Sequence, residues 1–86
     1  MDFEFYRNFI TVAETGNLTT ASKKLALAQP ALSAQIKTLE HYYGAKLIQT
    51  ARGKRQLTLT EAGEAFLGKA RQICRTEETI LLDMQS

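Results

Sequence analysis

The residues best suited to chemistry in this chain lie in the segment AQPALSAQIKT, residues 28–38. Gln29 carries an amide that can form two hydrogen bonds to the edge of an adenine base. Lys37, two helical turns later, offers a point charge suited to a phosphate group. The residues between them are mostly small or polar, which would let a helix backbone come close to base pairs. These residue types fit the surface of a nucleic acid; the alternative is that Gln29 is only a polar helix start.

Pro30 is the only proline in the chain, and it separates two stretches that both have helical periodicity. Proline interrupts a helix interior but is tolerated in a first turn. One helix is therefore expected to end near Ala26 and another to begin at Gln29 or Pro30, with its free N–H groups available to a phosphate. The second helix should bury a stripe made of Leu32, Ile36, Leu39 and Tyr43. Its outward face should carry Pro30, Ser33, Ala34, Lys37, Thr38 and His41.

Positive charge is concentrated in the middle of the chain. The net charge is +2, but between Thr15 and Thr60 seven basic residues face a single acid, Glu40, a local balance of +6. Charge alone leaves two explanations open: a surface that meets a polyanion, or a solvated basic face. The seven residues are Lys23, Lys24, Lys37, Lys46, Arg52, Lys54 and Arg55.

Several functional classes lack the residues that they need. With one histidine and no clustered carboxylates, the chain offers no nucleophile, base and orienting group for an enzyme and no metal site, so we expect no cofactor. The lone cysteine, Cys74, cannot form an internal disulfide, which fits the cytoplasm. It is interpreted as a small packing residue, with redox sensing as the alternative. No apolar run reaches the ~20 residues of a membrane helix, so no membrane partner is expected.

Helical spacing and capping residues predict the elements around this segment. A helix over residues 3–15 should end at Gly16, and Asn17 should cap a short helix that ends near Ala26. The helix that opens at Pro30 should stop at Gly44. Residues 46–50 and 56–60 alternate like strands, which predicts a hairpin. Its turn would present Arg52, Gly53, Lys54 and Arg55.

From Thr60 to the end the sequence predicts one helix of roughly 25 residues, about 38 Å long at ~1.5 Å per residue. The apolar stripe of this helix is too long for so small a domain to cover, so we expect it to pair with a second copy of the chain. A module for dimerisation alone would explain this helix but not the basic middle segment. The stripe consists of Phe66, Ala70, Ile73, Ile80 and Met84.

These expectations combine into a fold that is mainly α with a small β-hairpin. It is a winged helix-turn-helix followed by a long linker helix, with a DNA-binding domain over residues 1–59 and a dimerisation helix over residues 60–86.

Four motifs then match a known family in order and spacing: QPALS at 29–33, QIKTLE at 35–40, YGAKLI at 43–48 and LTEAGEAFL at 59–67. Together they resemble the N-terminal DNA-binding domain of LysR-type bacterial transcriptional regulators, from about Phe3 to the end of the chain. The resemblance implies double-stranded DNA with a partly palindromic operator as the partner. It also implies a homodimer, a higher oligomer in the full-length protein, and a small-molecule effector bound by a further domain that these 86 residues lack.

The resemblance also implies roles for individual residues. Major-groove contacts are expected from Gln29, Pro30, Ala31, Ser33 and Ala34. Phosphate contacts are expected from Lys37, Thr38, Lys23 and Lys24, and minor-groove contacts from the turn of the hairpin. The chain departs from the family at Ala28, where a serine or threonine usually caps the helix, and Gln29 is the alternative cap. Ala34 and Thr50 stand where many members have arginine.

Overall fold

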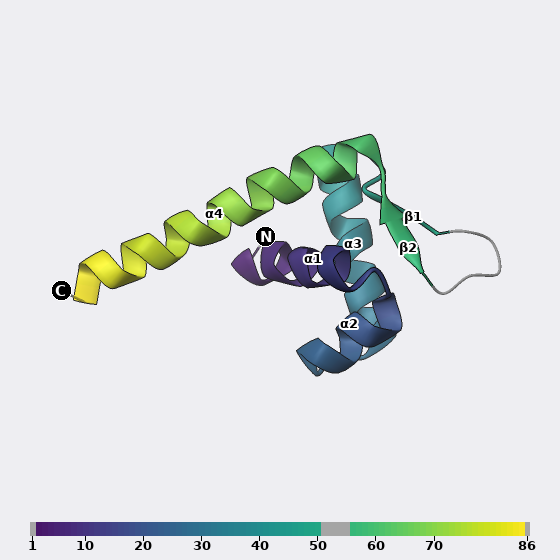
Figure 1. Ribbon diagram of the computed structural model, residues 1–86, viewed down its shortest axis with the longest axis horizontal. Helices are drawn as coiled ribbons and strands as arrows, with labels where there is room; N and C mark the ends of the chain where they lie inside the picture. Colours follow the sequence, from purple (N-terminus) through teal and green to yellow (C-terminus); the bar gives the residue numbers. More distant parts are fainter. Residues whose placement is uncertain (1, 51–55, 86) are drawn as a thin grey trace.

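The computed structural model describes residues 2–50 and 56–85, and within them the expected fold class is confirmed (Figure 1). Three helices, α1 (Phe3–Thr15), α2 (Leu18–Leu25) and α3 (Gln29–Tyr43), precede two short strands, β1 (Ile48–Thr50) and β2 (Leu57–Leu59). The long helix α4 (Glu61–Gln85) ends the described part of the chain. α1 lies beside α4, and the C-terminal end of α4 extends beyond the other elements (Figure 1).

The turn between α1 and α2 forms as its residue types predict. Gly16 adopts the left-handed conformation, with φ 66°, and its N–H donates to the Val12 carbonyl. Asn17 is extended, and its side-chain oxygen accepts a hydrogen bond from the Thr20 N–H at 2.9 Å. Glycine tolerates a positive φ and asparagine satisfies a free amide, so this local chemistry ends one helix and begins the next within two residues.

The third helix confirms the proline argument but corrects one member of its stripe. α3 begins at Gln29 with Pro30 in the first turn and stops at Gly44. Leu32, Ile36 and Leu39 are buried, but the prediction that Tyr43 belongs to the buried stripe is wrong, because it is 43% exposed.

Tyr43 lies instead at the edge of the core, in a small aromatic group. Its ring centroid lies 5.2 Å from that of Phe66, and its hydroxyl lies 2.6 Å from the Tyr6 hydroxyl. The hydrogen bond to Tyr6, with a smaller effect of burial, raises the pKa of Tyr43 to about 12. Tyr43 therefore joins the end of α3 to α1 and α4 without entering the core.

The hairpin is shorter than expected and is tied to the helices. β1 pairs antiparallel with β2, Ile48 opposite Leu59, so the strands cover three residues each instead of five. The Leu57 N–H donates to the Gly16 carbonyl at 2.9 Å, which attaches β2 to the turn between α1 and α2. The predicted turn residues, Arg52, Gly53, Lys54 and Arg55, lie outside the described residues.

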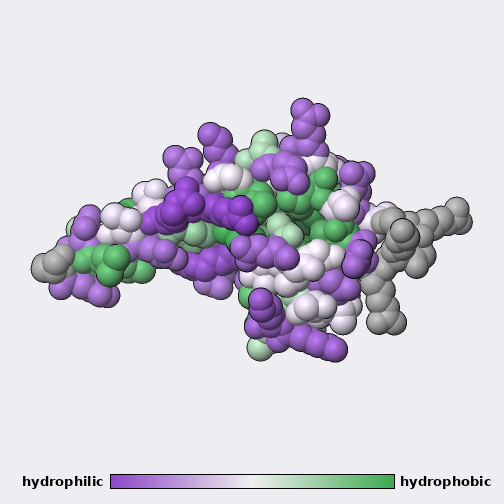
Figure 2. All heavy atoms as spheres, viewed as in Figure 1, coloured by the Kyte–Doolittle hydropathy of each residue, from purple (hydrophilic) through white to green (hydrophobic). Residues whose placement is uncertain are grey.

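The apolar stripe of α4 divides into two parts, which corrects its assignment as one dimerisation surface. Ala70 is fully buried, and Phe66 packs edge-on against Phe9 of α1 with ring centroids 4.9 Å apart. These two residues belong to the core of this chain. Ile80 and Met84 are 54% and 77% exposed, and Figure 2 shows hydrophobic side chains at the far end of α4. Cys74 is buried, as its interpretation as a packing residue predicts.

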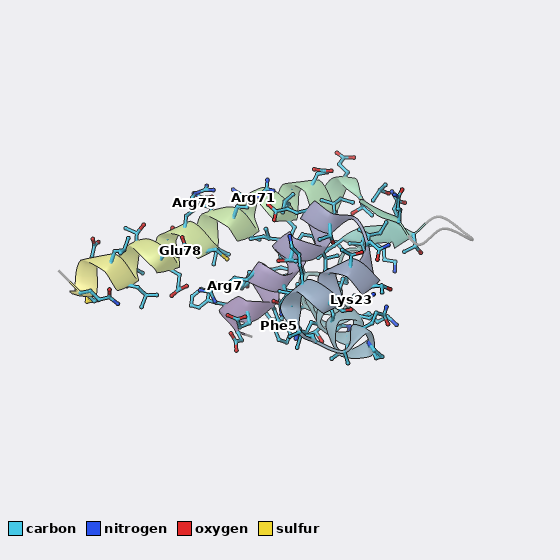
Figure 3. The ribbon with its side chains drawn as sticks, turned by 60° about the horizontal axis from the view of Figure 1, so that its bottom comes forward. Phe5, Arg7, Lys23, Arg71, Arg75 and Glu78 are labelled. Carbon is cyan, nitrogen blue, oxygen red and sulfur yellow. The ribbon has the colours of Figure 1, made fainter. Side chains whose placement is uncertain are left out.

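Ion pairs add to the apolar contact between α1 and α4. Arg7 of α1 pairs with Glu77, and Arg71 of α4 pairs with Glu14 at 3.3 Å. Figure 3 labels the two arginines, one on each helix. Arg7 also bonds Glu4, and these carboxylates raise the pKa of its guanidinium. None of the helices in the described ranges is both long and apolar enough to cross a membrane.

Candidate nucleic-acid interface

The face of α3 that points away from the core carries the residues expected to contact DNA. Gln29, Pro30, Ala31, Ala34, Lys37 and Thr38 are exposed, and Ser33 is half-buried. Because Leu32, Ile36 and Leu39 are packed inside, the helix cannot rotate without exposing them. The side chains available to a partner at this face are therefore small, polar or basic.

A buried amide pair also fixes α3 against α1. The Asn8 amide donates to the Gln35 side-chain oxygen at 2.8 Å, and Asn8 is 4% exposed. An unpaired amide at this depth would cost about 1–3 kcal/mol, so the pair favours a single register of the two helices. Nothing in the sequence spacing of Asn8 and Gln35 predicts this contact.

The start of α3 has no side-chain cap. Ala28 is extended, with φ −65° and ψ 138°, and no side chain accepts a hydrogen bond from the first turn. The alternative in which Gln29 caps the helix is therefore not realised. Within the described residues the Gln29 amide makes no hydrogen bond, which leaves it available to an external partner at the positive end of the helix dipole.

The residues expected at phosphates differ in how available they are. Lys37 is exposed on α3, and Lys23 and Lys24 are exposed in the last turn of α2. The Thr38 hydroxyl donates to the Ala34 carbonyl at 3.0 Å. Its proton is already used within the helix, so a phosphate would have to take this hydrogen bond from Ala34.

Glu40 connects α3 to the hairpin. Its carboxylate accepts hydrogen bonds from the Leu47 N–H at 2.8 Å and the Ile48 N–H at 3.4 Å, and its side chain is 12% exposed. The one acid in the basic middle segment thus fixes the start of β1 beside α3. Charge counting could not predict this role, because it depends on a contact across seven residues.

We expect Glu40→Ala to lower the free energy of unfolding by about 1.5–3 kcal/mol, the range for hydrogen bonds to a charged group. Glu40→Gln should lower the free energy of unfolding by less, because its amide oxygen can still accept a hydrogen bond from these backbone N–H groups. Urea unfolding measures both, and Glu78→Ala on the exposed side of α4 should stay within about 0.5 kcal/mol of the unsubstituted chain. An equal, small effect of all three substitutions would contradict the tethering role.

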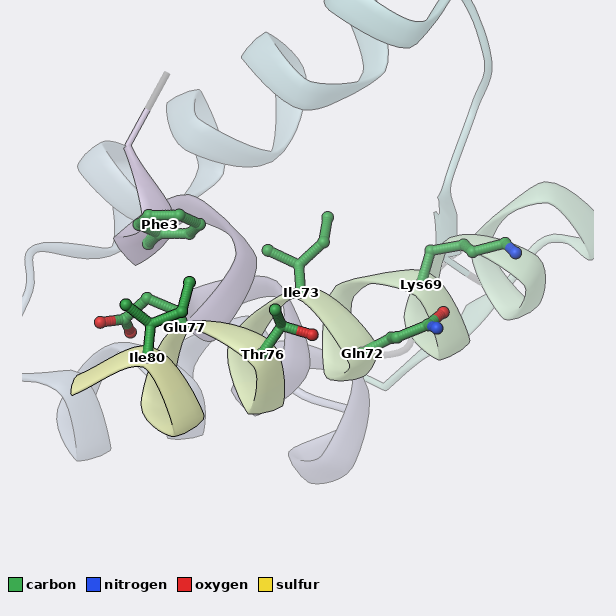
Figure 4. Close-up of a pocket in the computed structure, with 7 residues that line it drawn as sticks. All are labelled: Phe3, Lys69, Gln72, Ile73, Thr76, Glu77 and Ile80. Carbon is green, nitrogen blue, oxygen red and sulfur yellow. The ribbon is translucent and has the colours of Figure 1, made fainter. Parts of the chain in front are cut away.

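An apolar groove runs along α4 where α1 begins (Figure 4). It has a volume of about 370 Å³, and its apolar side chains are Phe3, Ile73 and Ile80. Two members of the predicted stripe, Ile73 and Ile80, therefore line one continuous surface.

Comparison with known proteins places this geometry in a family. The sequence model described as "Bacterial regulatory helix-turn-helix protein, lysR family" matches residues 3–64, most of the chain. The chain belongs to the LysR family. It is 41% identical over 85 residues to the HTH-type transcriptional regulator BsdA of Bacillus subtilis, covering 99% of this chain and 29% of BsdA. It is 42% identical over 82 residues to the Hca operon transcriptional activator HcaR of Escherichia coli, covering 95% of this chain and 27% of HcaR.

Solved LysR-family structures share the fold. The crystal structure of the CbnR DBD–DNA complex has a TM-score of 0.91 at 35% identity and covers 99% of this chain and 95% of that one. The BenM DBD complex with benA site 1 DNA has a TM-score of 0.89 at 32% identity, covering 99% and 96%. The matched curated relatives are transcriptional regulators, and the chain spans less than a third of the length of BsdA or HcaR.

Proposed function

We propose that this chain binds double-stranded DNA sequence-specifically, as the DNA-binding part of a LysR-family transcriptional regulator. The observation that carries the proposal is the exposed face of α3, which is small, polar and basic and is held outward by its buried stripe. The likeness to two solved DBD–DNA complexes over 99% of the chain supports it. α3 would lie in the major groove, with Gln29 and Ser33 at base edges and Lys37 at a phosphate.

The wing and the basic residues of α2 would complete the interface. Lys23 and Lys24 would meet phosphates, and the hairpin turn, which lies outside the described residues, would reach the minor groove beside the half-site. The DNA-binding domain would occupy residues 1–59 and the dimerisation helix residues 60–86. The protein would act in the cytoplasm without enzymatic activity.

The chain would bind as a homodimer through α4, and its operator would then be partly palindromic. The groove between α1 and α4, together with exposed Met84, supports an apolar dimer surface. In the whole protein a further domain would bind a small-molecule effector and support a higher oligomer.

Two substitutions on α3 should impair DNA binding in different ways. Gln29→Ala should remove roughly 1–3 kcal/mol of discrimination at one base position of each half-site and leave the salt dependence of binding nearly unchanged. Lys37→Ala should weaken specific and scrambled duplexes alike and make the salt slope shallower by about one per subunit. The measurement is binding to a site selected from a random duplex library, to single-base variants of that site and to a scrambled duplex, across a salt series.

The outcomes distinguish a residue that contacts base edges from one that contacts only the DNA phosphates. Equal loss of affinity for every duplex by Gln29→Ala would contradict base reading by Gln29. An unchanged salt slope in Lys37→Ala would contradict its phosphate contact.

A further inference from the structure

A second groove separates α3 from the hairpin. It has a volume of about 400 Å³ and lies between the start of α2, the outward side of α3 and the strand β1. Ser33 and Lys37 line it from α3, Gln49 and Thr50 line it from β1, and Lys46 lies just before that strand. The groove therefore joins the expected DNA-reading face to the base of the wing.

The described lining of this groove is suited to an anion. It contains two lysines and no acidic residue, and Ser33, Gln49 and Thr50 add hydroxyl and amide donors. Leu18, at the beginning of α2, and Ile48 of β1 complete the described lining with apolar side chains. The shared chemistry of the polar groups is hydrogen bonding and charge pairing with phosphate oxygens.

Lys46 is only loosely paired. Its ammonium lies 3.9 Å from the Glu40 Oε1 atom, a long ion-pair distance, and its side chain is 76% exposed. The other carboxylate oxygen of Glu40 accepts the Leu47 and Ile48 N–H groups. Lys46 therefore has room for a second anion on its solvent side.

The geometry of duplex DNA indicates which anion fits. One sugar–phosphate strand separates each major groove from the neighbouring minor groove. A helix in the major groove and a hairpin beside it over the next groove must have that strand between them. The space between α3 and β1 is the groove described above.

We propose that Lys46, at the base of the wing, is a phosphate contact in this groove, on the same stretch of sugar–phosphate backbone as Lys37. This inference rests on the proposed function and adds a residue, Lys46, that sequence reasoning counted only as part of a basic segment. Lys46 binds from the hairpin side and Lys37 from α3, so the two lysines contact the same stretch of backbone from opposite sides.

The test uses the duplex selected from a random library, with single phosphates replaced by neutral methylphosphonates. Lys46→Ala should weaken binding about tenfold at 0.1 M salt and make the salt slope shallower by about one per subunit. At the phosphate that Lys46 contacts, a methylphosphonate should weaken binding of the unsubstituted chain but should not weaken binding of Lys46→Ala any further. The phosphate identified in the same way with Lys37→Ala should lie within one nucleotide of it, on the same strand. Arg75→Ala, which removes one charge from the exposed side of α4, should leave the slope unchanged.

Each result has a defined meaning. Binding by the unsubstituted chain with an unchanged slope in Lys46→Ala would overturn this inference and leave the proposed function standing. The inference would also be overturned if the phosphates assigned to Lys46 and Lys37 lay on different strands. Failure of the unsubstituted chain to bind any duplex would overturn the proposed function and this inference together.

Discussion

Gly63→Ala is expected to destabilise the protein by about 3 kcal/mol or more, at or beyond the upper end of the usual effect of overpacking. An added Cβ at Gly63 would lie 1.9 Å from the Leu47 carbonyl oxygen and 2.9 Å from its carbon. These are backbone atoms that cannot rotate away, and the same carbonyl accepts the Thr60 N–H at 3.0 Å. The first turn of α4 and the start of the hairpin would have to separate.

Gly68 provides the matched control in the same helix. A Cβ built at Gly68 meets nothing within 4 Å, so alanine there should only gain helix propensity, about 0.8–1 kcal/mol of stability. Urea or thermal unfolding of the two variants separates the effect of the close contact at Gly63 from the effect of alanine's higher helix propensity. If the Gly63→Ala variant were as stable as the unsubstituted chain, this would contradict the close contact between α4 and Leu47.

Ile80→Asp is expected to lower the dimer association constant by about 100-fold or more. Ile80 is 54% exposed in the single chain, so folding should tolerate the change. In a dimer through the groove of Figure 4, the new carboxylate would be buried against the apolar side chains that line it, a cost of several kcal/mol. Ile73 lines the same groove but is half-buried in its own chain, which makes Ile80 the cleaner position.

Sedimentation equilibrium at tens of micromolar measures this effect. Arg75→Asp places a carboxylate on roughly the opposite side of α4, where the residue is exposed, and should dimerise like the unsubstituted chain. The proposed dimer surface would be contradicted if the Ile80→Asp variant dimerised as well as the unsubstituted chain. It would also be contradicted if the unsubstituted chain were only monomeric.

Local chemistry made most of the helix boundaries predictable. Gly16, Asn17 and Gly44 act at the positions where they stand in the sequence, because each satisfies or permits the backbone of its own turn. Pro30 marks the start of α3 for the same reason. The side of α3 that faces outward also followed from spacing, because its buried leucines and isoleucine repeat at the helical period.

Features that depend on the approach of distant segments were not predictable in this way. The stripe of α4 divides because α1 begins at Phe3 and its contacts with α4 reach only as far as Glu77 and Ile80, so the last turns of the longer helix remain uncovered. Gly63 carries no local signal, since its constraint is the Leu47 carbonyl sixteen residues earlier. Glu40 looked like a lone acid among cations, and only the position of β1 reveals its hydrogen bonds.

The most direct test of the central claim compares one duplex selected by this chain from a random library with a scrambled duplex of the same composition. Binding of the unsubstituted chain is measured for both across a salt series that includes physiological ionic strength. Base reading by α3 predicts an affinity for the selected duplex at least about 10³-fold higher than for the scrambled one, with a preference that persists as salt weakens both. Equal affinities for the two duplexes at every salt concentration would contradict sequence-specific DNA binding.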